Sequence, residues 1–318
     1  MTSMLPLPEF KLLQPTTVAE ALEMLSANSD AKLISGGTDL LPSMKHGLFK
    51  PKVLISTKRI KGLKDISINE EGLSIGAGVT HTSLRRSETV AGFAPALLEA
   101  CKAIATPTIQ SMGTIGGNIL LDTRCVFYNQ TRFWRDSING CLKCDGSICH
   151  VVQNKQECFA AHSADTVPVL MVMGASVVIA GLQGERTVPI ESLYDIDGRD
   201  SGRLKKEEIL VRVIIPKTRG EFGFRKLRVR GAIDYPLIVT AVRITPDGGR
   251  VVVSGIGPAP IEIQEVTGAI ASGDFSKAAE IARSQVKPLG THNVSPNWRR
   301  HMVEVEVRRC LEKTSSKP

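Results

Sequence analysis

The stretch SGGTD, residues 35–39, stands between a short apolar run at residues 31–35 and a segment of helical character at residues 40–46. Glycine permits a sharp turn and lets a ligand approach the backbone closely. Amides left free at the start of a helix attract phosphate oxygens, and the helix dipole assists them. Because a second strand is expected at residues 53–56, the stretch predicts a small α/β unit with a phosphate site at its turn. A purely steric use of the two glycines explains the turn equally well.

A second glycine stretch, GTIGGN at residues 113–118, brings further free amides and hydroxyl groups. Two such loops could hold the two phosphates of one dinucleotide from opposite sides, although a pair of ordinary turns would use the same residues. Neither stretch matches the six-residue dinucleotide fingerprint, and the sequence has no P-loop. We therefore expect no nicotinamide or ATP site built on those two motifs.

Five of the seven cysteines follow closely after the second stretch: Cys125, Cys141, Cys144, Cys149 and Cys158. Clustered thiols in a reducing compartment bind metal or perform redox chemistry more often than they form a disulfide framework. The intervening sequence is polar and lacks helical periodicity, so a metal centre would supply the cross-link that hydrophobic burial cannot. Thiolates suit an iron–sulfur cluster, which commonly takes four cysteines. Zinc and chance clustering are the alternatives, although only Cys141 and Cys144 form the close pair that a zinc ribbon needs twice.

Basic residues surround these cysteines in the sequence: Arg124, Arg132, Arg135, Lys143 and Lys155. Their charges could offset the negative charge of a thiolate-bound cluster and shift its reduction potential. They could equally form a docking face for an acidic ferredoxin, or be ordinary solvated charges of a loop.

The overall composition is that of a globular protein with a diffuse basic surface. The 40 basic and 32 acidic residues give a formal charge of +8, but basic residues such as those at 225–230 alternate with apolar ones, which favours a strand over a nucleic-acid-binding tail. The N-terminus lacks the order of a signal peptide, and no apolar run is long enough to cross a membrane. We therefore expect a cytoplasmic protein that binds neither nucleic acid nor a membrane.

The last third of the chain predicts a separate domain. Residues 222–229, 237–244 and 250–254 have the pattern of a three-stranded antiparallel meander, and residues 275–311 are mainly helical. A domain boundary is expected near residues 216–220.

The two glycine stretches and this meander together resemble the FAD-binding subunits of the xanthine dehydrogenase family, the molybdenum hydroxylases. The resemblance covers nearly the whole chain and implies an α+β fold. A p-cresol methylhydroxylase-type FAD-binding domain would span residues 1–217, with two α/β subdomains at about 1–57 and 58–217 and an inserted iron–sulfur loop at 122–160. Residues 218–318 would form a C-terminal domain like that of CO dehydrogenase flavoproteins, with a three-stranded antiparallel sheet and helices.

The cysteine stretch narrows the resemblance to the beta subunits of 4-hydroxybenzoyl-CoA reductases. The segments DTRCVFYNQ at 122–130, CLK at 141–143 and CHV at 149–151 carry it. In that branch of the family the inserted loop binds an additional 4Fe-4S cluster. The implied ligands are Cys125, Cys141, Cys149 and Cys158, and Cys144 is left out.

By this resemblance FAD lies between the two subdomains, with its pyrophosphate held by the two glycine loops. The implied FAD-binding residues are Ile34, Ser35, Gly36, Gly37, Thr38, Asp39, Leu40, Leu41, Thr106, Met112, Thr114, Gly116, Gly117, Asn118, Asp122 and Thr123. Two further positions come from the resemblance alone: Asp165, near the flavin or its ribose, and Lys226, facing the isoalloxazine. A helix-capping role for Asp165 is the alternative.

The resemblance implies an electron-transfer subunit of an oxidoreductase, with no catalytic residue for the substrate in this chain. A molybdopterin-binding large subunit would hold the substrate, and a small subunit would hold two 2Fe-2S clusters, in a heterohexamer. A ferredoxin-like donor would supply electrons for the reductive removal of the phenolic hydroxyl of 4-hydroxybenzoyl-CoA. The alternatives are the flavoprotein subunit of an aldehyde- or xanthine-oxidising molybdenum enzyme, a zinc-stabilised binding module, and a self-sufficient flavin oxidase.

Overall fold

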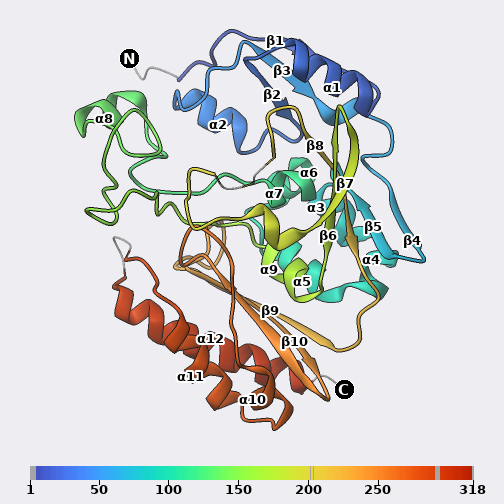
Figure 1. The fold of residues 1–318 in the computed structure, drawn as a ribbon, viewed down its shortest axis with the longest axis vertical. Coiled ribbons are helices and arrows are strands. Elements are labelled where there is room, and N and C mark those ends of the chain that lie inside the picture. Colours follow the sequence, from blue (N-terminus) through green and yellow to red (C-terminus); the bar gives the residue numbers. More distant parts are fainter. Residues whose placement is uncertain (1–4, 201, 203, 291–293, 317–318) are drawn as a thin grey trace.

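Three sheets organise the part of the chain that the structure describes. The computed structural model covers residues 5–200, 202, 204–290 and 294–316. Figure 1 shows the blue N-terminal unit at one end, the central sheet in the middle and the orange and red C-terminal domain at the other end, with a green segment extending to one side. The predicted mixture of α/β units and an antiparallel C-terminal sheet is confirmed.

The first sheet is small and parallel. Its strands lie in the order β1 (Lys11–Leu13), β3 (Val53–Ser56) and β2 (Ala31–Ile34). Helix α1 (Val18–Ala27) turns its apolar side inward, and Thr17 caps it by accepting a hydrogen bond from the backbone N–H of Glu20. Strand β2 leads through the first glycine loop into α2 (Leu40–Lys45), which is the predicted strand–turn–helix order.

The central sheet is antiparallel throughout. Its strands lie in the order β4 (Ile66–Asn69), β5 (Gly72–Gly76), β8 (Ile209–Ile215), β6 (Ser176–Gly181) and β7 (Gly184–Pro189). Strands consecutive in the chain form two hairpins in this sheet, β4–β5 and β6–β7. The short helices outside the first sheet and the inserted loop are η1 (Thr57–Arg59), α3 (His81–Arg86), α4 (Glu88–Phe93), α5 (Pro95–Ala103), α6 (Pro107–Met112), α7 (Ile115–Ile119), α9 (Val167–Val172) and η2 (Ile190–Leu193).

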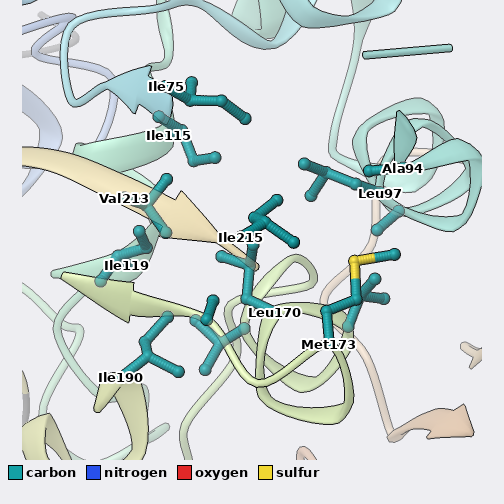
Figure 2. Packing of buried hydrophobic residues seen from close by; sticks show 14 of the residues in the cluster. Ile75, Ala94, Leu97, Ile115, Ile119, Leu170, Met173, Ile190, Val213 and Ile215 are labelled. Carbon is teal, nitrogen blue, oxygen red and sulfur yellow. The ribbon is translucent and has the colours of Figure 1, made fainter. Parts of the chain in front are cut away.

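The largest hydrophobic core lies between the central sheet and these helices. Figure 2 shows Ile215 of β8 beside Leu170 of α9, and Val213 of β8 between Ile115 and Ile119 of α7. All five side chains are buried, and the branched aliphatic residues interlock in place of the scarce aromatic ones. This packing holds α7, and with it the second glycine loop, on a rigid support.

The C-terminal domain contains an antiparallel sheet covered by helices. The strands are β9 (Glu221–Leu227), β10 (Ile238–Thr245), β11 (Gly248–Ser254) and β12 (Ile261–Glu262), in the order β12-β11-β10-β9, and the helices are α10 (Thr267–Ala271), α11 (Phe275–Gln285) and α12 (Pro296–Ser315). The predicted meander is present as β9–β11. The sequence missed β12 because two residues cannot show an alternating pattern. Among the helices of the described ranges, none has both the length and the apolar character of a membrane span.

The segment at 122–160 leaves the main body and returns to it through a narrow neck. Arg124 and Ala161 each donate a backbone N–H to the carbonyl of the other at 2.8 Å. Beyond this neck the segment contains α8 (Arg132–Ser137) and a tight turn between Cys141 and Cys144. Figure 1 shows α8 at the outer end of this green segment.

Candidate functional site

A cavity of about 710 Å³ lies where the two glycine loops meet. Its volume is in the range of small-molecule and cofactor sites. Both loops line it, together with β2 and the neck of the inserted segment. The predicted FAD-binding residues among its lining are Ile34, Ser35, Gly36, Gly37, Thr38, Asp39, Leu40, Thr114, Gly116, Gly117, Asn118 and Asp122. The structure therefore brings together two stretches that lie far apart in the sequence.

The first glycine loop offers free backbone donors to this cavity. Within the described residues, no hydrogen bond is found for the amide N–H groups of Gly36, Gly37 and Thr38. Gly37 has a φ of 70°, in the left-handed region that glycine adopts without strain. Consecutive free amides in such a turn form a concave anion site, as expected for a phosphate-binding loop.

The second glycine loop differs from the prediction of free amides. The N–H groups of Ile115 and Gly116 donate to the carbonyls of Val79 and Ala77, each at 2.9 Å, and those of the next two residues donate to Thr114. These bonds start α7 and fasten it to the chain after β5, so they occupy the amides that a phosphate would need. The prediction was wrong here because a glycine pattern does not show which amides the following helix uses.

Four predicted FAD-binding residues are not among those that line the cavity: Leu41, Thr106, Met112 and Thr123. The side chain of Thr106 caps α6 by accepting a hydrogen bond from the N–H of Ile109 at 3.2 Å. Thr123 is fully buried and donates its hydroxyl to the carbonyl of Gly198 at 2.7 Å. These contacts shape the loops that line the cavity.

Asp165 and Lys226 pair with each other outside the cavity lining. The ammonium of Lys226 lies 2.7 Å from Oδ2 of Asp165, also donates to the carbonyl of Ala103 at 3.1 Å, and both paired side chains are buried. Burial raises the pKa of Asp165 to about 6, against the lowering effect of Lys226. Helix α9 has Thr166 at its N-cap and no side-chain capping bond, so Asp165 does not cap it. The pair joins the C-terminal domain to the central one, and its placement near the flavin stays a prediction.

Several charged and aromatic side chains that the sequence did not assign to FAD also line the large cavity. Asp39 forms an ion pair with Arg124, whose guanidinium lies 4.8 Å from the ring centre of Tyr235. Burial raises the pKa of Asp39, and Arg124 opposes that shift. At the β2 side, the ammonium of Lys32 lies 4.3 Å from the ring centre of Phe49. Tyr235 comes from the C-terminal domain, in a turn where no sequence signal marks it.

A second, much smaller cavity is enclosed by the inserted segment. Its lining includes Cys125, Cys141, Cys149 and Cys158, the four thiols that the resemblance implies, and does not include Cys144. All seven cysteines of the chain are free thiols. Burial raises the pKa of Cys125 to about 11, because a desolvated surrounding favours the protonated thiol.

The four thiols line one cavity without converging on a single point. Among the residues that the structure describes, no three His, Cys, Asp or Glu side chains converge closely enough to hold one ion. In an iron–sulfur cluster the four thiolates surround a multi-iron core, so they need not converge on one point. The free volume of about 10 Å³ holds no more than about one water molecule, so the four thiols would have to move apart to admit a cluster core.

The structure separates the five basic residues around the cysteines. Arg132 and Lys155 are exposed, and Arg135 is buried and donates to backbone carbonyls at the end of α2. Arg124 belongs to the large cavity, and the side chain of Lys143 is only 6% exposed. These charges therefore lie in different environments and do not make one common surface.

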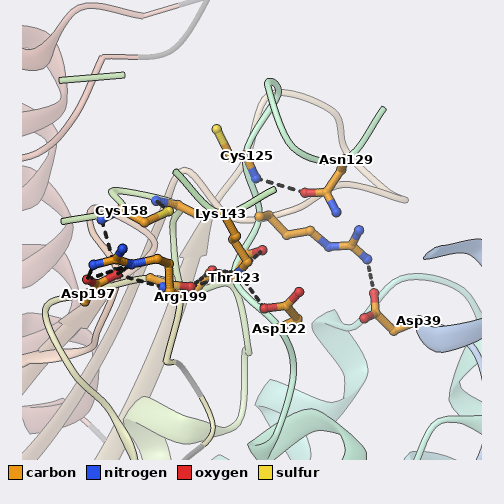
Figure 3. A network of polar contacts seen from close by, with 12 residues as sticks. Asp39, Asp122, Thr123, Cys125, Asn129, Lys143, Cys158, Asp197 and Arg199 are labelled. Atoms are coloured by element: carbon orange, nitrogen blue, oxygen red, sulfur yellow. Dashed lines mark hydrogen bonds and ion pairs between the residues drawn. The ribbon is translucent and has the colours of Figure 1, made fainter. Parts of the chain in front are cut away.

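The far end of the inserted segment is fastened to the turn at residues 197–199. The backbone N–H of Cys158 donates to Oδ1 of Asp197 at 3.2 Å, and Gly198 donates its own N–H to the carbonyl of Cys158 at 2.7 Å. The Arg199 guanidinium holds the pKa of Asp197 at about 2. Figure 3 shows this turn beside Lys143 and Thr123, so one thiol of the small cavity is held against the wall of the large one.

Known proteins share both the sequence pattern and the fold. Residues 8–218 match the family model described as the FAD binding domain in molybdopterin dehydrogenase. The chain is 31% identical over 269 residues to the aldehyde oxidoreductase FAD-binding subunit PaoB of Escherichia coli, covering 81% of this chain and 84% of that one. It is 27% identical over 320 residues to the 6-hydroxypseudooxynicotine dehydrogenase complex subunit alpha of Paenarthrobacter nicotinovorans, and the alignment covers 96% of this chain and 94% of that one. Among solved structures, reconstituted CO dehydrogenase from Oligotropha carboxidovorans aligns with a TM-score of 0.80 at 22% identity, covering 98% of this chain and 100% of that one.

A fold and a cavity of this kind place the protein in the class of FAD-binding redox domains. Within that class, the family match extends over both α/β units and the inserted segment. The chain belongs to the FAD-binding domain family of the molybdopterin dehydrogenases, and it is an oxidoreductase subunit of the molybdenum hydroxylase type. The resemblance drawn from the two glycine loops is confirmed at this level.

Proposed function

We propose that this chain carries both FAD and a 4Fe-4S cluster, and that it is the electron-transfer subunit of a 4-hydroxybenzoyl-CoA reductase. The observation that carries the proposal is the grouping of Cys125, Cys141, Cys149 and Cys158 around one cavity directly beside the FAD cavity. Two redox sites in contact suit a protein whose task is to pass electrons.

The residues of the large cavity account for how FAD would be held. The free amides of Gly36, Gly37 and Thr38 would bind the pyrophosphate, and the second glycine loop would line the cavity without offering the amides that α7 uses. Tyr235 and Arg124 would fix the position of the C-terminal domain over the cavity. When bound, FAD supplies two-electron chemistry and the cluster supplies single-electron steps, while the chain binds, orients and tunes them.

The partner subunits follow from the family. A large subunit would hold molybdopterin and the thioester substrate, and a small subunit would hold two 2Fe-2S clusters, in a heterohexamer. A ferredoxin-like donor would deliver electrons to the inserted segment, and removal of the phenolic hydroxyl would take place on the large subunit. We also propose the domain division at residues 217 and 218 and a cytoplasmic location.

The flavoprotein subunit of an aldehyde-oxidising molybdenum enzyme is the second candidate. The observation that favours it is the 31% identity to the aldehyde oxidoreductase subunit of Escherichia coli. In that case electrons would flow outward, from molybdenum through this chain to an acceptor.

The test begins with the complex purified without oxygen. We expect bound FAD and about four irons and four sulfides on this chain beyond those of the small subunit. A colourless chain that contains zinc would overturn the proposal. The assembled complex is then assayed for reduction of 4-hydroxybenzoyl-CoA and for oxidation of aromatic aldehydes. Activity with aldehydes alone would identify the chain as the flavoprotein subunit of an aldehyde-oxidising enzyme.

A further inference from the structure

Two residues line both cavities, Tyr128 and Lys143. The ring of Tyr128 is buried, and the ammonium of Lys143 lies 4.8 Å from its centre. These two side chains therefore form the partition between the FAD cavity and the thiol cavity. A charge held in this partition acts on both sites at once.

The charge on Lys143 is held in one place. An ammonium has three N–H donors, and here they meet Oδ1 of Asp122 at 2.5 Å, the carbonyl of Gly198 at 2.8 Å and the hydroxyl of Thr123. Figure 3 shows Lys143 between Cys158 on one side and Thr123 and Asp122 on the other. Because the side chain is 6% exposed, water and dissolved salt screen it weakly.

The ion pair of Lys143 and Asp122 is oriented, with its negative end toward the FAD cavity. Asp122 lines only the FAD cavity, whereas Lys143 also lines the thiol cavity. The carboxylate therefore cancels much of the positive charge on the FAD side. On the thiol side burial raises the pKa of Cys158 and the charge of Lys143 opposes that shift, so the field of the ammonium reaches the thiols. A cluster with four thiolates becomes more negative by one charge when it takes up one electron, so a nearby positive charge favours its reduced state.

We propose that Lys143 and Asp122 form a fixed dipole in the partition that raises the reduction potential of the cluster relative to that of the flavin. This inference rests on the proposed function, since it requires both cofactors. Lys143 acts here as a positioning residue, and the effect is electrostatic. We expect no comparable effect from Arg132 and Lys155, because their charges are exposed and water screens them.

The test is a redox titration of the anaerobically purified complex, with the cluster followed by electron paramagnetic resonance and the flavin by absorbance. Lys143→Met keeps an unbranched chain without the charge, and we expect it to lower the cluster potential more than the flavin potential. Lys143→Arg keeps the charge and should stay near the wild type. Lys155→Met removes an exposed charge from the same segment and should shift neither potential.

A second variant keeps the test decisive if Lys143→Met does not hold its cofactors. Asp122→Asn leaves the ammonium uncompensated, and we expect both potentials to rise, the flavin potential more. A loaded Lys143→Met protein with the wild-type cluster potential would overturn the inference, as would a fall of either potential in Asp122→Asn. Absence of any iron–sulfur signal in the wild-type chain would instead refute the proposed function.

Discussion

Gly36 lies directly against the backbone carbonyl of Met112: a β-carbon added to Gly36 would stand 1.9 Å from that oxygen. No real Cβ contact is that short, so the two glycine loops meet only because residue 36 has no side chain. The atoms in the way belong to the backbone of Met112 and Gly113, so no side-chain rotation can relieve the clash.

Replacing this glycine should therefore separate the loops. We expect Gly36→Ala to weaken FAD binding at least about tenfold, or about 1.4 kcal/mol, because the free amides of the first loop move away from the second loop. Flavin content after purification and FAD titration by fluorescence measure the effect. Gly92→Ala is the matched control, since an added β-carbon at that helical position meets nothing within 4 Å. Wild-type FAD affinity in Gly36→Ala would contradict the assignment of the cavity.

The ion pair between Asp39 and Arg124 makes a second prediction about FAD. Arg124→Gln should weaken FAD binding by roughly tenfold, because it leaves the carboxylate of Asp39 unpaired in the cavity that receives two phosphates. Arg124→Lys retains a positive charge and should recover part of the loss. Equal affinity in the glutamine variant and the wild type would show that this ion pair has no part in cofactor binding.

The proposed cluster predicts which cysteines would hold iron. Cys141→Ser removes one of the four lining thiols and should abolish most of the four-iron signal while FAD stays bound. Cys144 is only two residues beyond Leu142, but its thiol lies outside that cavity and donates to Asp145 at 3.3 Å, so Cys144→Ser should keep its iron. Iron and sulfide analysis on both variants gives the answer, and equal losses would mean that a different set of four ligates the cluster.

The buried carboxyl of Asp165 predicts a dependence of stability on pH. Its pKa is raised from 3.8 to about 6 in the folded chain, so its protonation contributes stability that is complete below pH 3.8 and is lost as the pH rises through 6. The total is on the order of 2 to 3 kcal/mol. Urea unfolding from pH 4 to pH 7.5 measures it. Asp165→Asn cannot ionise, so its unfolding free energy should lack this fall, and parallel pH profiles for the two proteins would contradict the burial effect.

The sequence predicted the supporting architecture well because that architecture depends on local patterns. The glycine turn after β2 and the strand pattern of β9 to β11 gave elements that the structure confirms. The short helices α3, α4, α6 and α7 were not predicted, since five or six residues complete too little of the helical period to be distinguished from loops.

The site was predicted only in part, because hydrogen bonding and burial in the folded chain cannot be read from the sequence pattern. Gly36 and Gly37 could be found because a turn demands glycine, whereas the amides of the second loop are used by α7, which no pattern of glycines reveals. Tyr235 reaches the cavity from a distant domain, and the partition role of Lys143 depends on burial that a polar loop sequence does not disclose. The four lining thiols came from the resemblance, since spacing alone would have chosen the pair of Cys141 and Cys144.

The backbone bridge between Arg124 and Ala161 has an evolutionary consequence. Because the two ends of the segment are hydrogen-bonded to each other, the residues between them form a closed loop that is attached to the rest of the protein at one place. A descendant could gain, lose or exchange the proposed cluster by changing this segment alone, without altering the sheets or the two glycine loops. The redox repertoire of such a subunit can thus diversify at one point without the fold being invented anew.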